Sequence, residues 1–296
     1  MKGLKNIWLI CLLPILVTQT AIAQTSKVNK AIELYSAKKL DSAKVLINEA
    51  IQSPESNKDY NAWMMRGVIY KDLYKANQLS NVVSPYRDSA TVSFIQSLQM
   101  DAENKNPQKE LVLKSLNYLA SLYHNDISKT LDTVNYQQSL SNAEKHKAIK
   151  KVIDPAFNEQ KYYYEVYSTV GSMFEKEFER SMSKTMLDLA KTYLMKAYEL
   201  NSNTDFINKN IGVLYYNQAV DIIKKMDYDV PLDQLPVYQD QSVAMGKQAL
   251  PYLIKANQIN PTDKAVVEGL AGIYYLLNDS EKYNEYKKKI EEMNKQ

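Results

Sequence analysis

Residues 210–223 read NIGVLYYNQAVDII and place a glycine, Gly212, inside a run whose apolar residues recur with helical spacing. Glycine in a helix interior costs about 1 kcal/mol relative to alanine, so this position needs a compensating gain. Tyr215 follows three residues later. The pair predicts a helix whose backbone comes close to a neighbouring helix at Gly212, with the tyrosine filling the space beside the contact.

The same spacing, a small residue followed three places later by an aromatic one, recurs along the chain. Further copies are Gly67–Tyr70, Ala120–Tyr123, Gly171–Phe174 and Ala271–Tyr274, with Ala31–Leu34 as a weaker one. Similarity at repeated intervals is the signature of a repeat architecture. With few glycines and no alternation of apolar and polar residues, the sequence predicts an all-α protein.

A second pattern follows each copy of the first. The segments SFIQSLQMDAEN (93–104), YLMKAYELNSNTD (193–205) and YLIKANQINPTD (252–263) align without gaps over most of their length. Each ends in a polar or proline-containing turn, which predicts the end of a helix. The small residue three places before each segment, and the matching ones in the other units, are Ala43, Ala90, Ala143, Ala190 and Ala249. The predicted unit is a helix, a turn, a second helix and another turn.

In this arrangement the sequence resembles the tetratricopeptide repeat family, whose unit reads W-x2-L-G-x2-Y followed by A-x3-F. The best-matching unit supplies Trp63, Gly67, Tyr70, Ala90 and Phe94. The resemblance covers most of residues 27–290 in about six units. It implies an all-α, right-handed α-solenoid of about six helical hairpins, in which the small residues lie where the two helices of a hairpin touch. We expect residues 24–296 to form one such domain.

Only the first unit, from Ala31 to Ala43, has the standard spacing between the small residues of its two helices. The longer spacing elsewhere predicts lengthened helices or inserted loops around residues 77–89, 124–136 and 226–241. Such insertions often lie on the binding face of a repeat protein. In the third unit, Lys147 and Lys150 occupy positions where small or apolar residues are expected.

The N-terminus reads MKGLKNIWLICLLPILVTQTAIAQ, with two lysines, a short apolar run and a small-residue site ending at Ala23. This is the pattern of a secretory signal peptide over residues 1–23, cut after Ala23. The alternative is an uncleaved anchor, but residues 7–17 fall short of the ~20 apolar residues that a spanning helix needs. We therefore expect a periplasmic or secreted protein, without membrane insertion of the mature chain. Cys11 lies in this segment, so the mature chain has no cysteine.

Composition argues against several function classes. The formal net charge is +3 and no basic tract is interleaved with aromatics, so we expect no nucleic-acid partner. With His124 and His146 as the only histidines, we expect neither a metal site nor a cofactor. Nothing combines a nucleophile, a base and an oxyanion donor, so we expect no enzyme and no catalytic residues. A hydrolase that uses His124, at the start of a predicted loop, is the remaining enzymatic alternative.

The resemblance also implies that the first helices line a concave groove. The positions beside the packing residues would face it, and these predict a ligand-binding set of Met64, Lys71, Asn117, His124, Glu175, Lys209, Tyr216, Glu268 and Tyr275. The set does not reproduce the Lys/Asn/Arg clamp with which some family members hold the C-terminal carboxylate of a chaperone. A receptor for chaperone tails is therefore disfavoured.

Tyrosine is abundant, with 23 residues and a dense cluster, KYYYEVY, at residues 161–167. Many of these rings fill packing positions, but tyrosine is also enriched at protein interfaces and can stack on sugar rings. We expect a non-enzymatic scaffold or adaptor of the bacterial cell envelope, which binds a protein or peptide on its concave face. The alternative is a glycan-binding helical-repeat protein of a carbohydrate-uptake system.

Overall fold

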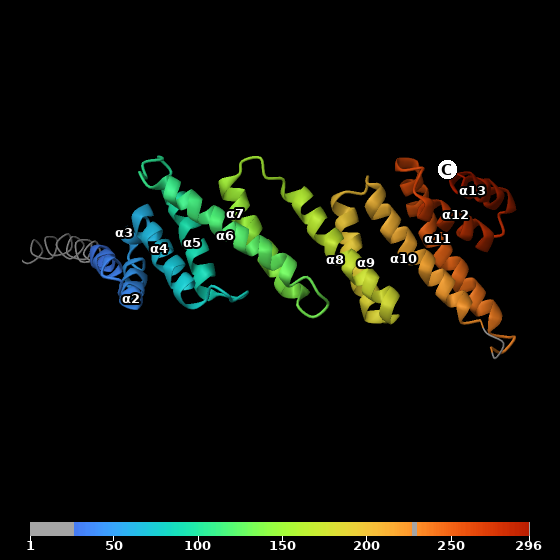
Figure 1. Ribbon diagram of the computed structural model, residues 1–296, viewed down its shortest axis with the longest axis horizontal. Coiled ribbons are helices and arrows are strands. Elements are labelled where there is room, and N and C mark those ends of the chain that lie inside the picture. Colours follow the sequence, from blue (N-terminus) through green and yellow to red (C-terminus); the bar gives the residue numbers. More distant parts are fainter. Residues whose placement is uncertain (1–26, 227–229, 296) are drawn as a thin grey trace, which may run out of the picture. The chain divides into compact units, whose positions relative to one another are not determined.

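The computed structural model describes residues 27–226 and 230–295 (Figure 1). Within these ranges the regular structure is helical and contains no strand. The predicted signal peptide, residues 1–23, lies outside the described residues. None of the described helices is both long enough and apolar enough to span a bilayer.

The helices pair into six hairpins, as the repeat pattern predicts. A helix over residues 27–36 pairs with α2 (Leu40–Ala50), and the short α3 (Pro54–Asn57) leads into the second hairpin. The others are α4 (Tyr60–Asn77) with α5 (Pro85–Met100), α6 (Lys109–Lys129) with α7 (Tyr136–Ile153), α8 (Glu159–Ser181) with α9 (Lys184–Leu200), α10 (Asp205–Lys224) with α11 (Leu235–Ile259), and α12 (Lys264–Leu276) with α13 (Ser280–Met293). The all-α helical-repeat fold is confirmed.

The chain divides into two compact units. The first comprises the residues up to Thr130 together with Gln138–Phe157, and the second comprises Leu131–Gln137 together with Asn158–Gln296. Each unit holds three of the hairpins. A single domain over residues 24–296 stays a prediction.

Polar side chains fix where several helices begin. The side chains of Ser84, Thr204, Asp263 and Asp279 each accept a hydrogen bond from the backbone N–H three residues on. Such a cap satisfies one of the N–H groups that have no partner within the helix. The turns between helices are therefore encoded locally, and they set the length of helix available for packing.

The small residues lie where the two helices of a hairpin touch, as predicted. Three glycines of first helices face the large anchor residue of the second helix: a Cβ would lie 2.7 Å from the Phe94 ring at Gly67, 2.8 Å from Leu194 at Gly171 and 2.6 Å from Leu253 at Gly212. The second-helix residues Ala43, Ala90, Ala143, Ala190 and Ala249 are all buried. The glycine cost is offset by the burial of these anchors, each of which contributes about 1.5–3 kcal/mol.

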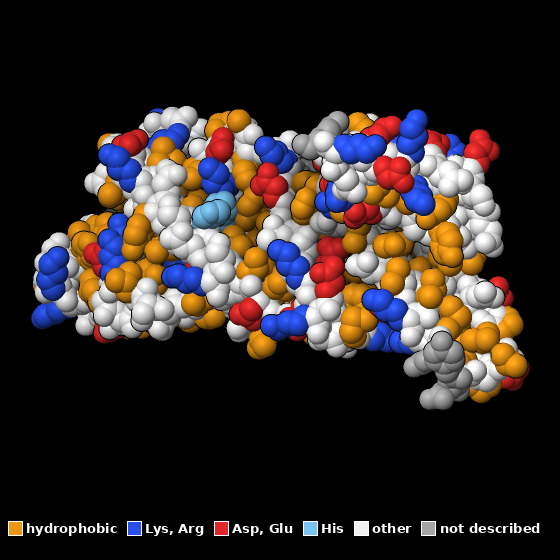
Figure 2. Space-filling view, turned by 45° about the vertical axis from the view of Figure 1, so that its right-hand side comes forward, with side chains coloured by type: hydrophobic (Ala, Val, Ile, Leu, Met, Phe, Trp, Pro, Cys, Tyr) orange, Lys and Arg blue, Asp and Glu red, His pale blue; other side chains and the backbone are white. Residues whose placement is uncertain are grey.

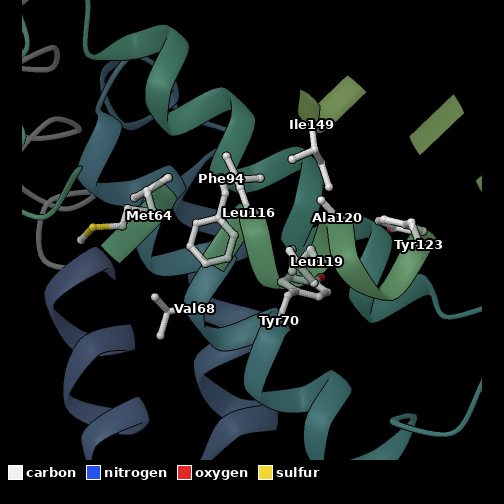
Figure 3. Close-up of a cluster of buried hydrophobic side chains, with 11 residues drawn as sticks. Met64, Val68, Tyr70, Phe94, Leu116, Leu119, Ala120, Tyr123 and Ile149 are labelled. Carbon is white, nitrogen blue, oxygen red and sulfur yellow. The ribbon is translucent and has the colours of Figure 1, made fainter. Parts of the chain in front are cut away.

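Figure 3 shows the packing around one anchor in the first unit. The Phe94 ring of α5 lies among Met64 and Val68 of α4 and Leu116 of α6. All four side chains are buried. One aromatic anchor thus joins a hairpin to the first helix of the next, which is how a repeat protein builds a continuous core.

Residues 124–136 show both of the predicted alternatives, a lengthened helix and an inserted loop. Helix α6 continues past His124 to Lys129, so the loop begins later than expected, and residues 130–135 form it. The buried face of α6 continues through Tyr123 to Asp126, so the last turns of this helix are packed against the first unit. In α7 the buried face passes from Ala143 to Ile149, so Lys147 and Lys150 lie beside the packing stripe and not in it.

Candidate functional site

A cavity of about 620 Å³ in the second unit is the strongest candidate for a binding site. Its lining comes from α10, α11, α12 and α13, and it includes two residues of the predicted groove, Tyr216 and Tyr275. Tyr274 and Tyr283 also contribute to the lining, and apolar walls come from Ile223, Val243 and Leu276. We call this site the tyrosine cavity.

A glycine lets the Tyr216 ring enter the tyrosine cavity. A Cβ on Gly272 would lie 2.8 Å from Tyr216 Cε2, so any larger residue at this position of α12 would displace the ring. Burial raises the pKa of the Tyr216 phenol, and the negative charge of Glu268 adds to this effect. The hydroxyl therefore stays neutral at physiological pH, and it can both donate and accept a hydrogen bond.

The mouth of the tyrosine cavity offers aromatic surface to solvent. Tyr275 is 71% exposed, and its ring centroid lies 5.4 Å from that of Tyr283 with a tilt of 54° between the planes. Polar side chains at the edge include Asp240 and Ser280. An apolar floor with aromatic rings and a polar edge is the composition typical of protein-interaction sites.

A second cavity of about 790 Å³, also in the second unit, contains Glu175 of the predicted set. The side chain comes from α8 and is only 8% exposed. Burial raises the pKa of its carboxyl group to about 8, and the neighbouring charge of Glu179 adds to the shift. Asn210 of α10 lines the same cavity, where its Nδ2 donates to Ser172 Oγ at 3.0 Å. We call this site the Glu175 cavity.

Asn117 and His124 line a smaller cavity of about 260 Å³ in the first unit, together with His146. The two histidine rings lie 5.5 Å apart. Burial lowers the pKa of His146 to about 4, with further contributions from His124 and Lys150. No aspartate or glutamate is among the described residues that line this cavity, and the Ser121 hydroxyl donates to the backbone of Asn117. A Ser-His-Asp triad around His124 is therefore not assembled there.

The remaining predicted residues are engaged elsewhere. Met64 is 4% exposed and packs in the core of the first unit, and it also borders a cavity of about 590 Å³ there; its role in ligand binding stays a prediction. Lys71 Nζ donates to Ser115 Oγ at 3.1 Å, and Lys209 Nζ lies 2.6 Å from Asp263 Oδ2. Glu268 pairs with Lys264 at 3.8 Å on the exposed side of α12. The nine residues thus occupy several sites.

Within the described part of the chain, no group of three or more His, Cys, Asp or Glu residues could hold a metal ion. On the face shown in Figure 2, basic and acidic side chains are interspersed and do not gather into a patch of one sign.

Sequence reasoning missed the second-helix members of the tyrosine cavity, Val243 of α11 and Tyr283 of α13. The expectation of a groove lined by first helices alone left them out. A usable signal exists in the C-terminal segment SEKYNEYKKK, where Tyr283 and Tyr286 are one helical turn apart. Tyr286 is buried and stacks on Tyr274, which places Tyr283 toward the cavity.

No family model matches the sequence, and no curated protein matches it. Among solved structures, a monomeric mutant of IFIT1 with Gppp-AAAA is 13% identical over 90% of this chain, with a TM-score of 0.36; the chain spans 50% of that protein's length. YrrB, described as a TPR protein with an unusual peptide-binding site, is 14% identical over 83% of this chain and 91% of its own, with a TM-score of 0.33. PilW, a type IV pilus biogenesis factor, is 17% identical over 90% and 92%, with a TM-score of 0.31. The tetratricopeptide-like packing is seen in the contacts within the hairpins of this chain, where Gly67, Gly171 and Gly212 face the second helix.

Proposed function

We propose that this protein is a non-enzymatic interaction scaffold, and that the tyrosine cavity binds a peptide segment of a protein partner. The observation that carries the proposal is that Tyr216, Tyr274, Tyr275 and Tyr283 all line one cavity. Two of these four side chains, Tyr216 and Tyr275, were expected to bind a partner from their places in the repeat pattern alone.

The size and lining of the tyrosine cavity favour an apolar side chain as its occupant. Its volume of about 620 Å³ falls in the range typical of ligand pockets, ~300–1,000 Å³. Ile223, Val243 and Leu276 supply surface that an apolar side chain would remove from water. The phenol groups of Tyr216 and Tyr275 supply hydrogen bonds to the backbone of the bound segment. Tyrosine rings lose little conformational entropy on binding, so they suit this role.

The proposed location is the bacterial envelope, and it rests on the signal-peptide pattern of residues 1–23. An exported scaffold would meet other envelope proteins, and its partner is proposed to be one of them. Fractionation of the native cells, with N-terminal sequencing of the mature chain, tests this part of the proposal. A chain that begins at Gln24 in the periplasmic or secreted fraction supports it, and an unprocessed cytosolic chain overturns it.

Site-specific photocrosslinking tests the binding site. A photoreactive aromatic residue at position 275 should crosslink to one dominant protein in native cells, and mass spectrometry should map the link to an apolar segment of that protein. The matched control places the same residue at Lys288, an exposed position of α13 outside the cavity lining. Equal crosslinking from both positions would overturn the assignment of the site.

Glycan binding is the second candidate, because the exposed ring of Tyr275 could stack on a sugar. Titration with oligosaccharides, followed by tyrosine fluorescence, separates the two. Saturable quenching that is lost in Tyr275→Ala, with no protein crosslinked from position 275, would favour the glycan.

A further inference from the structure

We propose that the Glu175 cavity is a second binding site, specific for an organic cation such as an alkylammonium or guanidinium group. It lies in a different cavity from the one assigned to the protein partner, so either proposal can fail without the other. The side chains that carry it are Glu175, Asn210 and Phe206.

Glu175 is the acceptor in this site. Its side chain is 8% exposed and borders the cavity, yet no described residue makes a hydrogen bond or an ion pair with its carboxyl group. Its carboxyl oxygens therefore have no partner within the described protein and can accept hydrogen bonds from a ligand in the cavity. The nearest basic residues of the lining do not supply that partner: Arg180 Nη2 lies 2.7 Å from Glu177 Oε2, and Lys176 is exposed.

Neighbouring groups complete a cation site. The Asn210 amide donates its Nδ2 to Ser172, which leaves Asn210 Oδ1 as a second acceptor for an N–H of the ligand. Phe206 lines the cavity, and its 46% exposed side chain offers a ring face on which a cation can rest. A carboxyl group, an amide oxygen and an aromatic face together suit an ammonium or guanidinium group better than an anion or an apolar ligand.

The charges around Glu175 are of both signs, and the burial of its carboxyl group predicts a pH dependence. Glu179 and Lys176 face Glu175 from α8, Lys209 faces it from α10, and Asp132 lines the cavity from the segment before α7. Lys209 is already paired with Asp263. Burial, with Glu179, raises the pKa of Glu175 to about 8, so the free site holds a proton at neutral pH. Binding of a cation forms the carboxylate and releases this proton to solvent.

A cation of this kind has two possible sources, a lysine or arginine side chain of a protein and a free polyamine. Calorimetric titration of the mature protein with putrescine and with an acetylated, amidated Gly-Lys-Gly peptide distinguishes them. Saturable binding of either probe supports the site and identifies its source. No saturable heat from either probe, or from agmatine as the guanidinium probe, at pH 9 would overturn the proposal.

Two variants and one pH comparison make the test specific. Glu175→Gln keeps the shape of the side chain and should abolish binding, whereas Glu179→Gln, an exposed neighbour on α8, should change affinity by less than about threefold. Affinity for the wild-type site should rise roughly tenfold or more from pH 6 to pH 9, because the cation competes with a proton. Circular dichroism confirms that both variants fold. Undiminished binding by Glu175→Gln, or affinity independent of pH, would refute the assignment.

Discussion

Gly212 of α10 lies directly against Leu253 of α11: a Cβ on Gly212 would come within 2.6 Å of Leu253 Cδ2 and 3.2 Å of the Leu253 backbone nitrogen. Because the obstacle includes backbone, the two helices could not accept a side chain here without moving apart. The glycine therefore sets the distance between the helices of this hairpin, and that hairpin supplies part of the wall of the tyrosine cavity.

The first prediction concerns this contact. Gly212→Leu should lower the free energy of unfolding by about 3 kcal/mol, because overpacking outweighs the gain in helix propensity. Urea denaturation followed by circular dichroism measures the change. The control is Ala244→Leu, at an exposed position of the same partner helix α11, which should change stability by less than about 0.5 kcal/mol. Equal stability of the two variants would contradict the inference that the two helices need a glycine at position 212.

The second prediction tests whether a glycine and its anchor act as a pair. A Cβ on Gly67 would lie 2.7 Å from the Phe94 ring, with no backbone among its nearest neighbours. Gly67→Ala should cost about 1–3 kcal/mol in the wild-type chain and clearly less in a Phe94→Ala background, where the ring is absent. A double-mutant cycle measures this coupling. Strict additivity of the two changes would show that Gly67 is not needed to make room for the Phe94 ring.

The third prediction concerns a buried ion pair in the first unit. Arg87 is 1% exposed, its Nη1 donates to Asp126 Oδ2 at 2.6 Å, and its guanidinium lies over the ring of Tyr123. Asp126→Asn should destabilise the protein by about 3–5 kcal/mol, because it leaves a buried charge without compensation. The comparison variant, Glu110→Gln, breaks an exposed pair with Lys114 and should cost less than about 1 kcal/mol. Similar losses in the two variants would contradict this account of the buried pair.

The fourth prediction concerns the contribution of His146 to stability, which is lost in mild acid; the raised pKa of Glu175 acts in the opposite direction over this range. Burial, His124 and Lys150 lower the pKa of His146 to about 4, from an unfolded value of 6.5. As the pH falls below 6.5, His146 binds a proton in the unfolded chain but stays neutral in the folded chain. The stabilising difference is therefore complete above pH 6.5 and is lost progressively toward pH 4.

Unfolding midpoints in urea at pH 7 and pH 5 measure this effect. The wild-type protein should lose about 1–2 kcal/mol from this group, after allowance for its partial exposure to solvent. His146→Gln should show a smaller loss over the same interval. An unchanged pH dependence in His146→Gln would show that His146 is not the titrating group.

The fold could be predicted from the sequence because the same spacing, from a small residue to an aromatic one, recurs in each repeat. The spacing from Gly212 to Tyr215, and from Gly67 to Tyr70, identifies first helices without reference to tertiary structure. The second helices were found through their alanines, such as Ala190 and Ala249, and the structure buries both. Helix ends were less predictable, since α6 continues past His124 for a reason that lies in another helix, the contact of Asp126 with Arg87.

The site was only partly readable. Tyr216 and Tyr275 were identified from their places beside the packing residues of first helices. Tyr283 and Val243 were not, because a cavity is formed by several helices and no single periodicity reports it. Met64, which the same pattern placed in the groove, packs in the core around Phe94 and also borders a cavity of the first unit. Burial from several directions is a tertiary property that the pattern of one helix does not contain.

The most direct test of the central claim compares the affinity of two tryptophan variants for the same peptide. Ser280 is exposed and lines the tyrosine cavity, whereas Glu281 is the next exposed residue of α13 and lies outside the lining. A fluorescent peptide from the protein crosslinked at position 275 would be titrated with each variant and followed by anisotropy. We predict that Ser280→Trp weakens binding roughly tenfold or more, about 1.4 kcal/mol, while Glu281→Trp leaves affinity within about twofold. Equal affinities for the two variants would contradict a binding site in the tyrosine cavity.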